Sequence, residues 1–524
     1  MTGSKDRWRG RLALGFVALV IAASASLVAG RNLAWDDADY LRDGLRVANS
    51  VRLDGPSRPG HALTSLLRVQ PKPPLLVGWI AAGGLIPALR TPSSLYLFAS
   101  LIPFVILLLV VAAVASSRSG RRGGFFALLI LAASPMALSF GAKVMVETFM
   151  GVWVLLAIWS MARLLDAPGR GRALALGVPL ALACLTKMTA ALLMPVPSAL
   201  ALVLMVRRHG LSKATAAMGW VVAVASSIAA PWYLRNGAAA IRFARFSARY
   251  NLEALGTPGR VGSMDRLPAI GRDLAGWPVV ALALVAGFVA FGEWRRSKAR
   301  SEAGSTDDFA LLAVACFASG ALILQVPLYF DPRFLLPAWP SVAVVLGASL
   351  ARIRWSSDRV PSLATGALLA VALVGSFGRL ADDPKTTTFW AARPLIDHLV
   401  ARYRIANLYN VGNCQDWNVS KTGLANEFRD DPRDCFVLHD LSGSLPPKFL
   451  KRLEGAEAVV MLDRSKLPTS WFAYGPALNR SCDFALAHLA NDRQFLRVED
   501  YPAAGLPPLL VFVRRDLRSA RAVR

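Results

Sequence analysis

The chain has 524 residues, of which 55% are hydrophobic and only 18% are charged, and its formal net charge is +25. Soluble domains carry about 25% charged residues, so this composition excludes an ordinary soluble protein and indicates a polytopic membrane protein. The first 380 positions hold 39 basic and 17 acidic residues. This excess favours anionic lipid head groups as partners, and nucleic acid is a poor alternative because no soluble basic domain is present to bind it.

Eleven apolar stretches run through the first three-quarters of the chain, and we expect each to form a transmembrane helix. Roughly 20 apolar residues cross a hydrocarbon core of about 30 Å. The first stretch resembles a cleaved signal, but ten further spans follow it, so we expect an uncleaved helix. The expected spans are 11–30, 94–116, 123–140, 144–162, 173–187, 190–206, 214–231, 276–293, 309–328, 335–351 and 361–379.

Basic residues gather in the loops that follow every second span, as in Arg118, Arg121 and Arg122 after the second. The positive-inside rule therefore places the N-terminus in the cytoplasm, and an odd number of spans places the C-terminal tail outside. The two longest loops, 31–93 and 232–275, then lie on the outer side. Both are rich in arginine, so they either solvate phospholipid head groups or form a basin for a phosphate-bearing substrate.

Residues 381–524 have the composition of a soluble domain, with 20 basic and 17 acidic residues. Strand-like segments alternate with helical ones, which predicts a small α/β domain. No glycine-rich loop follows a strand, so nucleotide binding is unsupported. In an oxidising compartment Cys414 and Cys435 could pair, but Cys482 is a third thiol and the sequence does not choose among them. The expected strands are 404–411, 434–438, 457–462 and 508–513, and the expected helices are 389–402, 446–454 and 475–490.

An acidic cluster, Asp36, Asp37 and Asp39, follows the first span directly. Carboxylates are costly near lipid, which makes them functional candidates. One use for them is group transfer from a lipid phosphate, because an aspartate can act as general base toward an acceptor hydroxyl. The phosphate that leaves needs charge neutralisation by Arg or Lys rather than protonation. One carboxylate and a few cations are therefore sufficient.

Six short motifs lie at predicted span ends or outer edges. In their order they resemble the GT-C superfamily of polytopic glycosyltransferases, in particular bacterial relatives of the protein O-mannosyltransferases and of the lipid A aminoarabinose transferase. Each motif is weak alone, but together they cover about residues 1–380. The motifs are Asp36-Asp37-Ala38-Asp39-Tyr40, Lys72-Pro73-Pro74-Leu75, Ser134-Pro135 with Glu147, Leu185-Thr186-Lys187, Pro231-Trp232-Tyr233-Leu234-Arg235-Asn236 and Arg333-Phe334-Leu335-Leu336-Pro337.

The resemblance implies a helical GT-C membrane domain of about 11 spans at 1–380 and a periplasmic α/β domain at 381–524, in a bacterial inner membrane. It also implies sugar transfer, with inversion, from a polyprenyl-phosphate donor to a lipid-linked or polymeric envelope acceptor, without a nucleotide-sugar. Basic outer loops weakly favour a phosphorylated acceptor such as lipopolysaccharide. The resemblance makes Asp36 the catalytic base and assigns substrate-binding roles to Asp37, Lys72, Glu147, Lys187 and Arg333.

The chain also departs from the family's pattern. Pro71 replaces an acidic residue that aminoarabinose transferases usually carry before Lys-Pro-Pro and that bears on metal binding, so a divalent cation stays possible and its site unknown. Met188 replaces a glycine often found after Leu-Thr-Lys, which indicates a differently shaped cavity.

Each candidate also has a structural interpretation. Asp37 and Asp39 could be solvated or cap a helix, and the prolines after Lys72 could serve only to start one. Glu147 could pair with Lys143 four residues earlier, Lys187 could reach the membrane interface, and Arg333 could pair locally with Asp331.

Two other classes of function stay open. A transporter or flippase for an anionic lipid or solute would also need intramembrane charges, but we find no inverted hydropathy repeat and the charges gather at outer ends. The second class is a non-catalytic scaffold that binds partners through its C-terminal tail. A covalently altered acceptor separates an enzyme from both.

Overall fold

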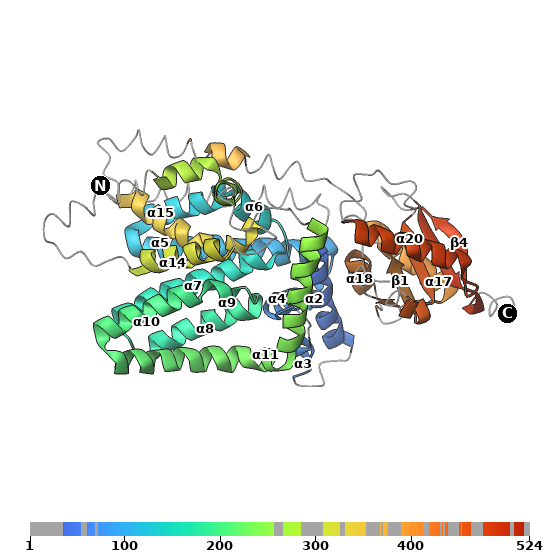
Figure 1. Ribbon diagram of the computed structural model, residues 1–524, viewed down its shortest axis with the longest axis horizontal. Helices are drawn as coiled ribbons and strands as arrows, with labels where there is room; N and C mark the ends of the chain where they lie inside the picture. Colours follow the sequence, from blue (N-terminus) through green and yellow to red (C-terminus); the bar gives the residue numbers. More distant parts are fainter. Residues whose placement is uncertain are drawn as a thin grey trace.

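The computed structural model consists of a helical region followed by a C-terminal α/β lobe (Figure 1). The longest stretch described without a break is 72–255. The described residues are 35–53, 60–68, 72–255, 266–284, 308–324, 331–352, 367, 370–375, 389–411, 419–429, 432, 435–438, 450–451, 453–462, 475–502 and 508–517. The expected first span, 11–30, lies outside them.

The segment expected as an outer loop, 31–93, is largely helical in its described part, and its position outside the membrane stays a prediction. Its longest helix begins at the acidic cluster and packs against the helix that follows Lys72-Pro73-Pro74. The two prolines immediately precede that second helix. The ring of a proline fixes φ near the helical value, which favours the start of a helix at this point. The elements are α2 (Trp35–Leu53), α3 (His61–Leu67), α4 (Leu75–Gly84) and the 3₁₀ turn η1 (Pro87–Leu89).

Helix α5 (Pro92–Ala133) contains the expected span 94–116 and the first part, 123–133, of the expected span 123–140. Its backbone leaves helical geometry at Ser119 and Gly120, where Gly120 has φ of +72°. Positive φ suits glycine because it has no Cβ. The halves fold back on each other, since a Cβ at Gly124 would lie 2.7 Å from the carbonyl oxygen of Ala112. A hairpin thus forms where two spans were predicted, and the second half ends at Ser134, before α6 (Pro135–Gly141).

The expected spans at 144–162, 173–187, 190–206 and 214–231 all coincide with helices. The last of them does not end at 231 but continues into the second expected outer loop, reaching α3 and the C-terminal lobe. Pro231 lies inside this last helix, α11, whose ribbon changes direction in Figure 1. A proline inside a helix is a common cause of such a kink. The helices are α7 (Val146–Asp166), α8 (Arg170–Thr186), α9 (Ala190–Leu193), α10 (Pro195–His209) and α11 (Leu211–Leu255).

The remaining expected spans are described in part. Residues 277–284 and 370–375 are helical within the spans expected at 276–293 and 361–379. Among the described helices, α5, α7 and residues 211–245 of α11 are long and apolar enough to cross a membrane, and α4 and α14 are shorter apolar helices. The other elements are α12 (Arg266–Ile270), the π-helical turn η2 (Gly271–Ala275), α14 (Asp308–Ile323), the 3₁₀ turn η3 (Pro332–Leu335) and α15 (Trp339–Arg352).

Helix α15 approaches α5 very closely at Gly347. A Cβ placed there would lie 2.5 Å from the amide nitrogen of Ala127, a backbone atom that cannot move aside freely. We expect Gly347→Ala to lower stability by about 1–3 kcal/mol through overpacking. Gly219→Ala is the matched control, because a Cβ at Gly219 meets nothing within 4 Å. Thermal unfolding in detergent tests this, and an equal midpoint for the two variants would contradict the close packing.

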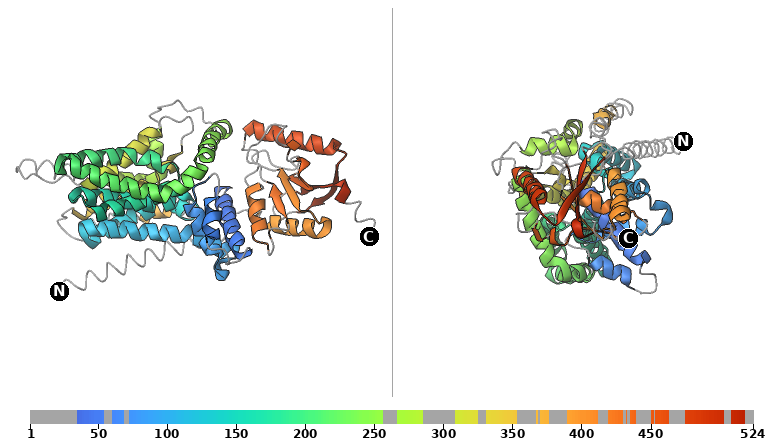
Figure 2. Two further views of the ribbon diagram at one scale, coloured as in Figure 1. Left: turned by 90° about the horizontal axis from the view of Figure 1, so that it is seen from below. Right: turned by 90° about the vertical axis from the view of Figure 1, so that its right-hand side faces the viewer.

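The C-terminal lobe is a five-stranded sheet flanked by helices, seen end-on in the right-hand view of Figure 2. The strand order is β2-β1-β3-β5-β4, with β1 parallel to β2 and β3, and β5 antiparallel to β3 and β4. All four expected strands exist, and β4 and α18 were missed. The elements are α17 (Phe389–Tyr403), β1 (Asn407–Val411), α18 (Val419–Glu427), β2 (Phe436–Leu438), β3 (Ala458–Leu462), α20 (Gly475–Asn491), β4 (Phe495–Tyr501) and β5 (Leu509–Arg514).

Cys414 lies outside the described residues and the side chain of Cys482 is not described, so the disulfide pairing stays a prediction. The helix expected at 446–454 is described only at its end, where residues 450–451 and 453–454 are helical.

Candidate functional site

The acidic motif forms the first turn of α2. Asp36 lies in this turn, and its side chain is outside the described part of the chain. Asp37 is fully buried, and the hydroxyl of Tyr96 donates to its Oδ2 at 3.2 Å. The same hydroxyl lies 3.2 Å from the carbonyl oxygen of Ala142, just before α7. Tyr96 therefore ties the acidic helix to the start of α7, and solvation does not explain Asp37.

Asp39 is also buried, and the second motif supplies its partner. Lys72 Nζ donates to Asp39 Oδ2 at 3.2 Å and lies 4.2 Å from the ring centroid of Tyr40. Nη1 of Arg42 lies 3.1 Å from Asp39 Oδ1. Buried charges persist only when they are paired, and this pairing satisfies both signs. The role of the Lys-Pro-Pro segment is thus more than starting α4, because its lysine reaches the acidic motif.

Arg42 was not predicted as part of the site. Its side chain is 8% exposed and also pairs with Asp43, with Nη2 2.9 Å from Oδ1. Burial alone would lower the pKa of Arg42, but Asp39, Asp43 and Glu427 outweigh it and raise the pKa above its usual value. The spacing between Asp39 and Arg42, three residues on a helix, was the available signal.

A second charged cluster forms at the start of α7. Glu147 is 2% exposed, and Lys187, at the end of α8, donates to its Oε1. Nε of Arg333, in η3, lies 4.0 Å from the same oxygen and 2.7 Å from Asp331 Oδ2. The two cations also lie near one ring, since Lys187 Nζ and Arg333 Cζ are 4.8 and 5.5 Å from the centroid of Phe334. Three motifs distant in sequence therefore meet at one carboxylate.

Of the two local ion pairs that the sequence suggested, the described residues form one, Arg333 with Asp331, and not the other, Glu147 with Lys143. The local pair of Arg333 with Asp331 exists, alongside the approach to Glu147. The ammonium of Lys143 lies 5.8 Å from the ring centroid of Phe140, and the ion pair of Glu147 is with Lys187. Because α7 begins at Val146, Lys143 precedes the helix and the four-residue spacing does not bring it to Glu147.

One apolar core joins the two charged clusters. Ala38 and Leu41 of α2 pack in the same core as Val146 and Phe149, which flank Glu147. Leu75, three residues after Lys72, borders this core and also a second one that contains Leu185. The clusters therefore lie at the same end of the helical region.

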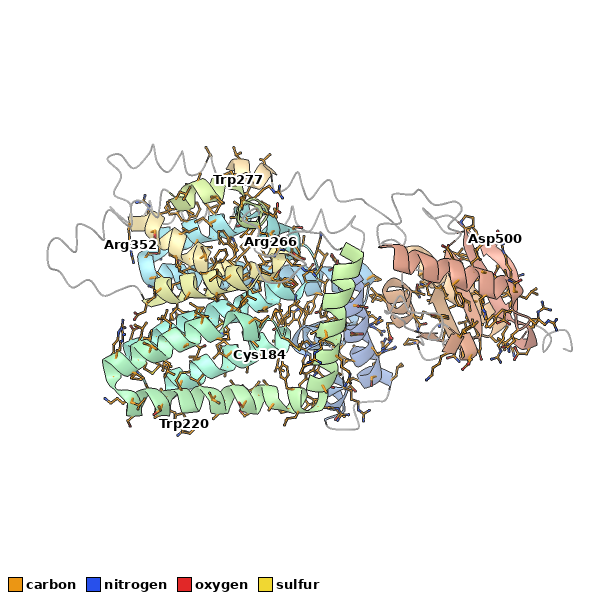
Figure 3. The ribbon with its side chains drawn as sticks, in the orientation of Figure 1. Cys184, Trp220, Arg266, Trp277, Arg352 and Asp500 are labelled. Atoms are coloured by element: carbon orange, nitrogen blue, oxygen red, sulfur yellow. The ribbon has the colours of Figure 1, made fainter. Side chains whose placement is uncertain are left out.

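The remaining motif, 231–236, and the Ser134-Pro135 part of the third motif hold this end together. Tyr233 donates its hydroxyl proton to the carbonyl oxygen of Cys184 at 2.8 Å, near the end of α8 that carries Lys187. Figure 3 labels Cys184 well inside the helical region. Asn236 donates to the carbonyl oxygen of Leu67 at 2.8 Å, and Ser134 Oγ accepts from Trp339 Nε1 at 2.7 Å. These motifs act as structural ties.

The described side chains do not form a metal site. No group of three His, Cys, Asp or Glu side chains gathers in the part of the chain described. Asp39 is paired with Lys72 and Arg42, so a cation would have to displace both. Because the side chain of Asp36 is not described, the binding of a divalent cation at this end stays a prediction.

The family model for dolichyl-phosphate-mannose-protein mannosyltransferase matches residues 72–234. No curated protein matches the chain in sequence. Among solved structures, ArnT from Cupriavidus metallidurans in the apo state has a TM-score of 0.62 at 14% identity, over 97% of this chain and 99% of ArnT. The chain has the fold of the GT-C superfamily.

Two further structures agree with this GT-C fold. ArnT bound to undecaprenyl phosphate has a TM-score of 0.62 at 14% identity, over 96% of this chain and 98% of ArnT. The oligosaccharyltransferase AglB from Archaeoglobus fulgidus, in complex with an inhibitory peptide and a dolichol-phosphate, has a TM-score of 0.52 at 12% identity, over 91% of this chain and 72% of AglB. The GT-C fold expected from the six motifs is therefore confirmed, and the family match covers residues 72–234.

Proposed function

We propose that this chain transfers a sugar from a polyprenyl-phosphate carrier to a lipid-linked or polymeric envelope acceptor on the periplasmic side of a bacterial inner membrane. Asp36 takes the proton of the acceptor hydroxyl, whose oxygen attacks the anomeric carbon. The bond between that carbon and the phosphate oxygen breaks with inversion. The carrier phosphate leaves, and Lys72, Lys187 and Arg333 neutralise its charge.

The observation that carries this proposal is the convergence of Lys187 and Arg333 on one buried oxygen of Glu147. Both cations keep about a fifth of their side-chain surface exposed, whereas Glu147 is buried. With Asp331 included, this cluster has equal numbers of positive and negative charges. When the carrier phosphate enters, Lys187 and Arg333 exchange one anionic partner for another. Neither cation is therefore left without an anion near lipid.

The distribution of basic turns supports the proposed orientation. Arg172 Nη1 donates to the carbonyl oxygen of Arg163, and His209 lies 2.8 Å from the carbonyl oxygen of Leu165. The basic turns after α7 and α10 therefore adjoin, and Figure 1 draws the α10–α11 turn at the end away from the C-terminal lobe. A cytoplasmic position for these turns leaves the acidic cluster and residues 381–524 on the periplasmic side.

Glu147 sets the affinity for the carrier phosphate in this mechanism. Glu147→Gln keeps the side-chain shape but removes one of the two anions that balance Lys187 and Arg333. We expect polyprenyl phosphate to bind about tenfold tighter and to leave more slowly, so that kcat falls while product inhibition grows. Equilibrium binding of polyprenyl phosphate measures this, and weaker binding by the variant would contradict a phosphate position at this cluster.

Comparison of envelope glycolipids by mass spectrometry tests the proposed function. Cells that lack this protein should lose the mass of one hexose, pentose or uronic acid from one glycolipid class, and the wild-type chain should restore it. Unchanged glycolipids together with an altered distribution of the carrier across the bilayer would instead favour a transporter.

A further inference from the structure

The C-terminal lobe contacts the acidic helix itself, through two buried polar residues and one exposed arginine. Helix α18 packs on α2 in Figure 1 and in the left-hand view of Figure 2. Nε of Arg46 lies 3.1 Å from Glu427 Oε1. Asn49 Nδ2 donates to Glu427 Oε2 at 3.1 Å and to the carbonyl oxygen of Glu427 at 2.9 Å. Glu427 and Asn49 are 6% and 4% exposed, whereas the side chain of Arg46 is 53% exposed, so the buried part of the contact is the Glu427–Asn49 pair.

The same contact reaches the charged groups of the site through Arg42. A Cβ at Gly423 of α18 would lie 2.9 Å from Cδ of Arg42, so α18 leaves room for this arginine only because residue 423 is a glycine. Arg42 in turn pairs with Asp39, which accepts from Lys72. A continuous series of contacts thus leads from the C-terminal lobe to the second motif.

We propose that α18 positions α2 for sugar transfer, with Glu427 and Gly423 as the positioning residues. This rests on the proposed function, because α2 carries the proposed base. Glu427 fixes α2 through Arg46 and Asn49, and Gly423 admits the Arg42 conformation that pairs with Asp39. The C-terminal lobe must therefore be docked on α2 for the reaction to proceed at its full rate. None of these residues contacts the substrate in this account, so they act on the geometry of α2 alone.

The physical reason for a large effect is the sensitivity of proton transfer to distance. A catalytic group that moves by about 1 Å can lose about 100-fold in rate. Gly423→Ala pushes the stem of Arg42 away from α18, and Glu427→Gln weakens its bond to Arg46 while keeping its shape. Both changes alter the position of α2 without removing any group proposed to meet the donor.

The experiment measures kcat, the KM for the polyprenyl-phosphate sugar and thermal unfolding of the full chain in nanodiscs. We expect Gly423→Ala and Glu427→Gln to lower kcat about tenfold or more and to change the donor KM by less than about twofold. Gly423→Ala gains helix propensity but displaces the buried stem of Arg42, so kcat is expressed per folded protein and the unfolding midpoint is measured beside it. Gly219→Ala and the exposed Glu454→Gln are the matched controls, and both should keep the wild-type kcat.

Amide hydrogen exchange across α2 gives a readout that does not require transfer. Glu427→Gln should raise exchange in α2, while Glu454→Gln should leave it unchanged. The proposal is overturned if both positioning variants keep the wild-type kcat, or if kcat falls only in proportion to lost folded protein. An inactive wild-type chain would instead count against the proposed function, and increased exchange in α2 would still support the contact with α18.

Discussion

Asp36→Asn should reduce sugar transfer by about 10²–10⁴-fold, because an asparagine cannot accept the proton of the acceptor hydroxyl. The substitution keeps the size of the side chain in the first turn of α2, so we expect wild-type abundance and an unchanged unfolding midpoint. The loss should appear in kcat, since the base acts in the transition state and not in donor binding. Reconstituted membranes that contain a polyprenyl-phosphate sugar and an acceptor lipid provide the assay.

Asp273→Asn is the matched control for this substitution. Asp273 lies in the second expected outer loop, where Arg272 Nε is 2.7 Å from its Oδ1, and it is far from the acidic motif in sequence. It should keep wild-type transfer. Near-wild-type kcat for Asp36→Asn would remove Asp36 from the mechanism and leave the base to another residue.

Arg333→Ala should raise the KM for the carrier about 10- to 100-fold, the amount expected from losing one charge-assisted hydrogen bond to a phosphate. Arg333→Lys should recover part of this loss, because it keeps the charge but not the two-pronged geometry. Kinetics at varied donor concentration measure the effect, with protein abundance followed in parallel. The pairing with Asp331 makes the parallel measurement necessary.

Arg272→Ala controls for the loss of a local arginine–aspartate pair. Arg272 pairs with the adjacent Asp273, as Arg333 does with Asp331, but no motif places it near the donor. It should leave the donor KM unchanged. Unchanged donor binding together with low abundance for Arg333→Ala would mean that the arginine serves only its structural pair.

The sequence predicted elements best where one physical signal dominated. Apolar length located α7, α8 and α14, and strand alternation located four of the five strands. The strand β4 carries charged residues on an edge of the sheet, which weakens its pattern. Helix α18 was missed because it contains Thr422, Gly423 and Asn426, which are poor helix formers. At least one of these, Gly423, is explained by its contact with Arg42 rather than by local preference.

The site was predictable as a set of residues but not as a set of pairs. The family resemblance assigned Glu147, Lys187 and Arg333 to one substrate site, whereas the partner of Glu147 depends on where α7 begins. Tyr96 and Arg42 were missed because each acts through a contact that only the packed helices create. The sequence analysis predicted no secondary structure for the outer loops, and α2 was therefore not foreseen.

Incubation of the purified chain in proteoliposomes with a polyprenyl-phosphate sugar and an envelope lipid tests the account most directly. We predict that mass spectrometry will detect the sugar covalently attached to the acceptor lipid, with one equivalent of free polyprenyl phosphate released. An intact donor that has only moved between the two leaflets, with the acceptor mass unchanged, would contradict it.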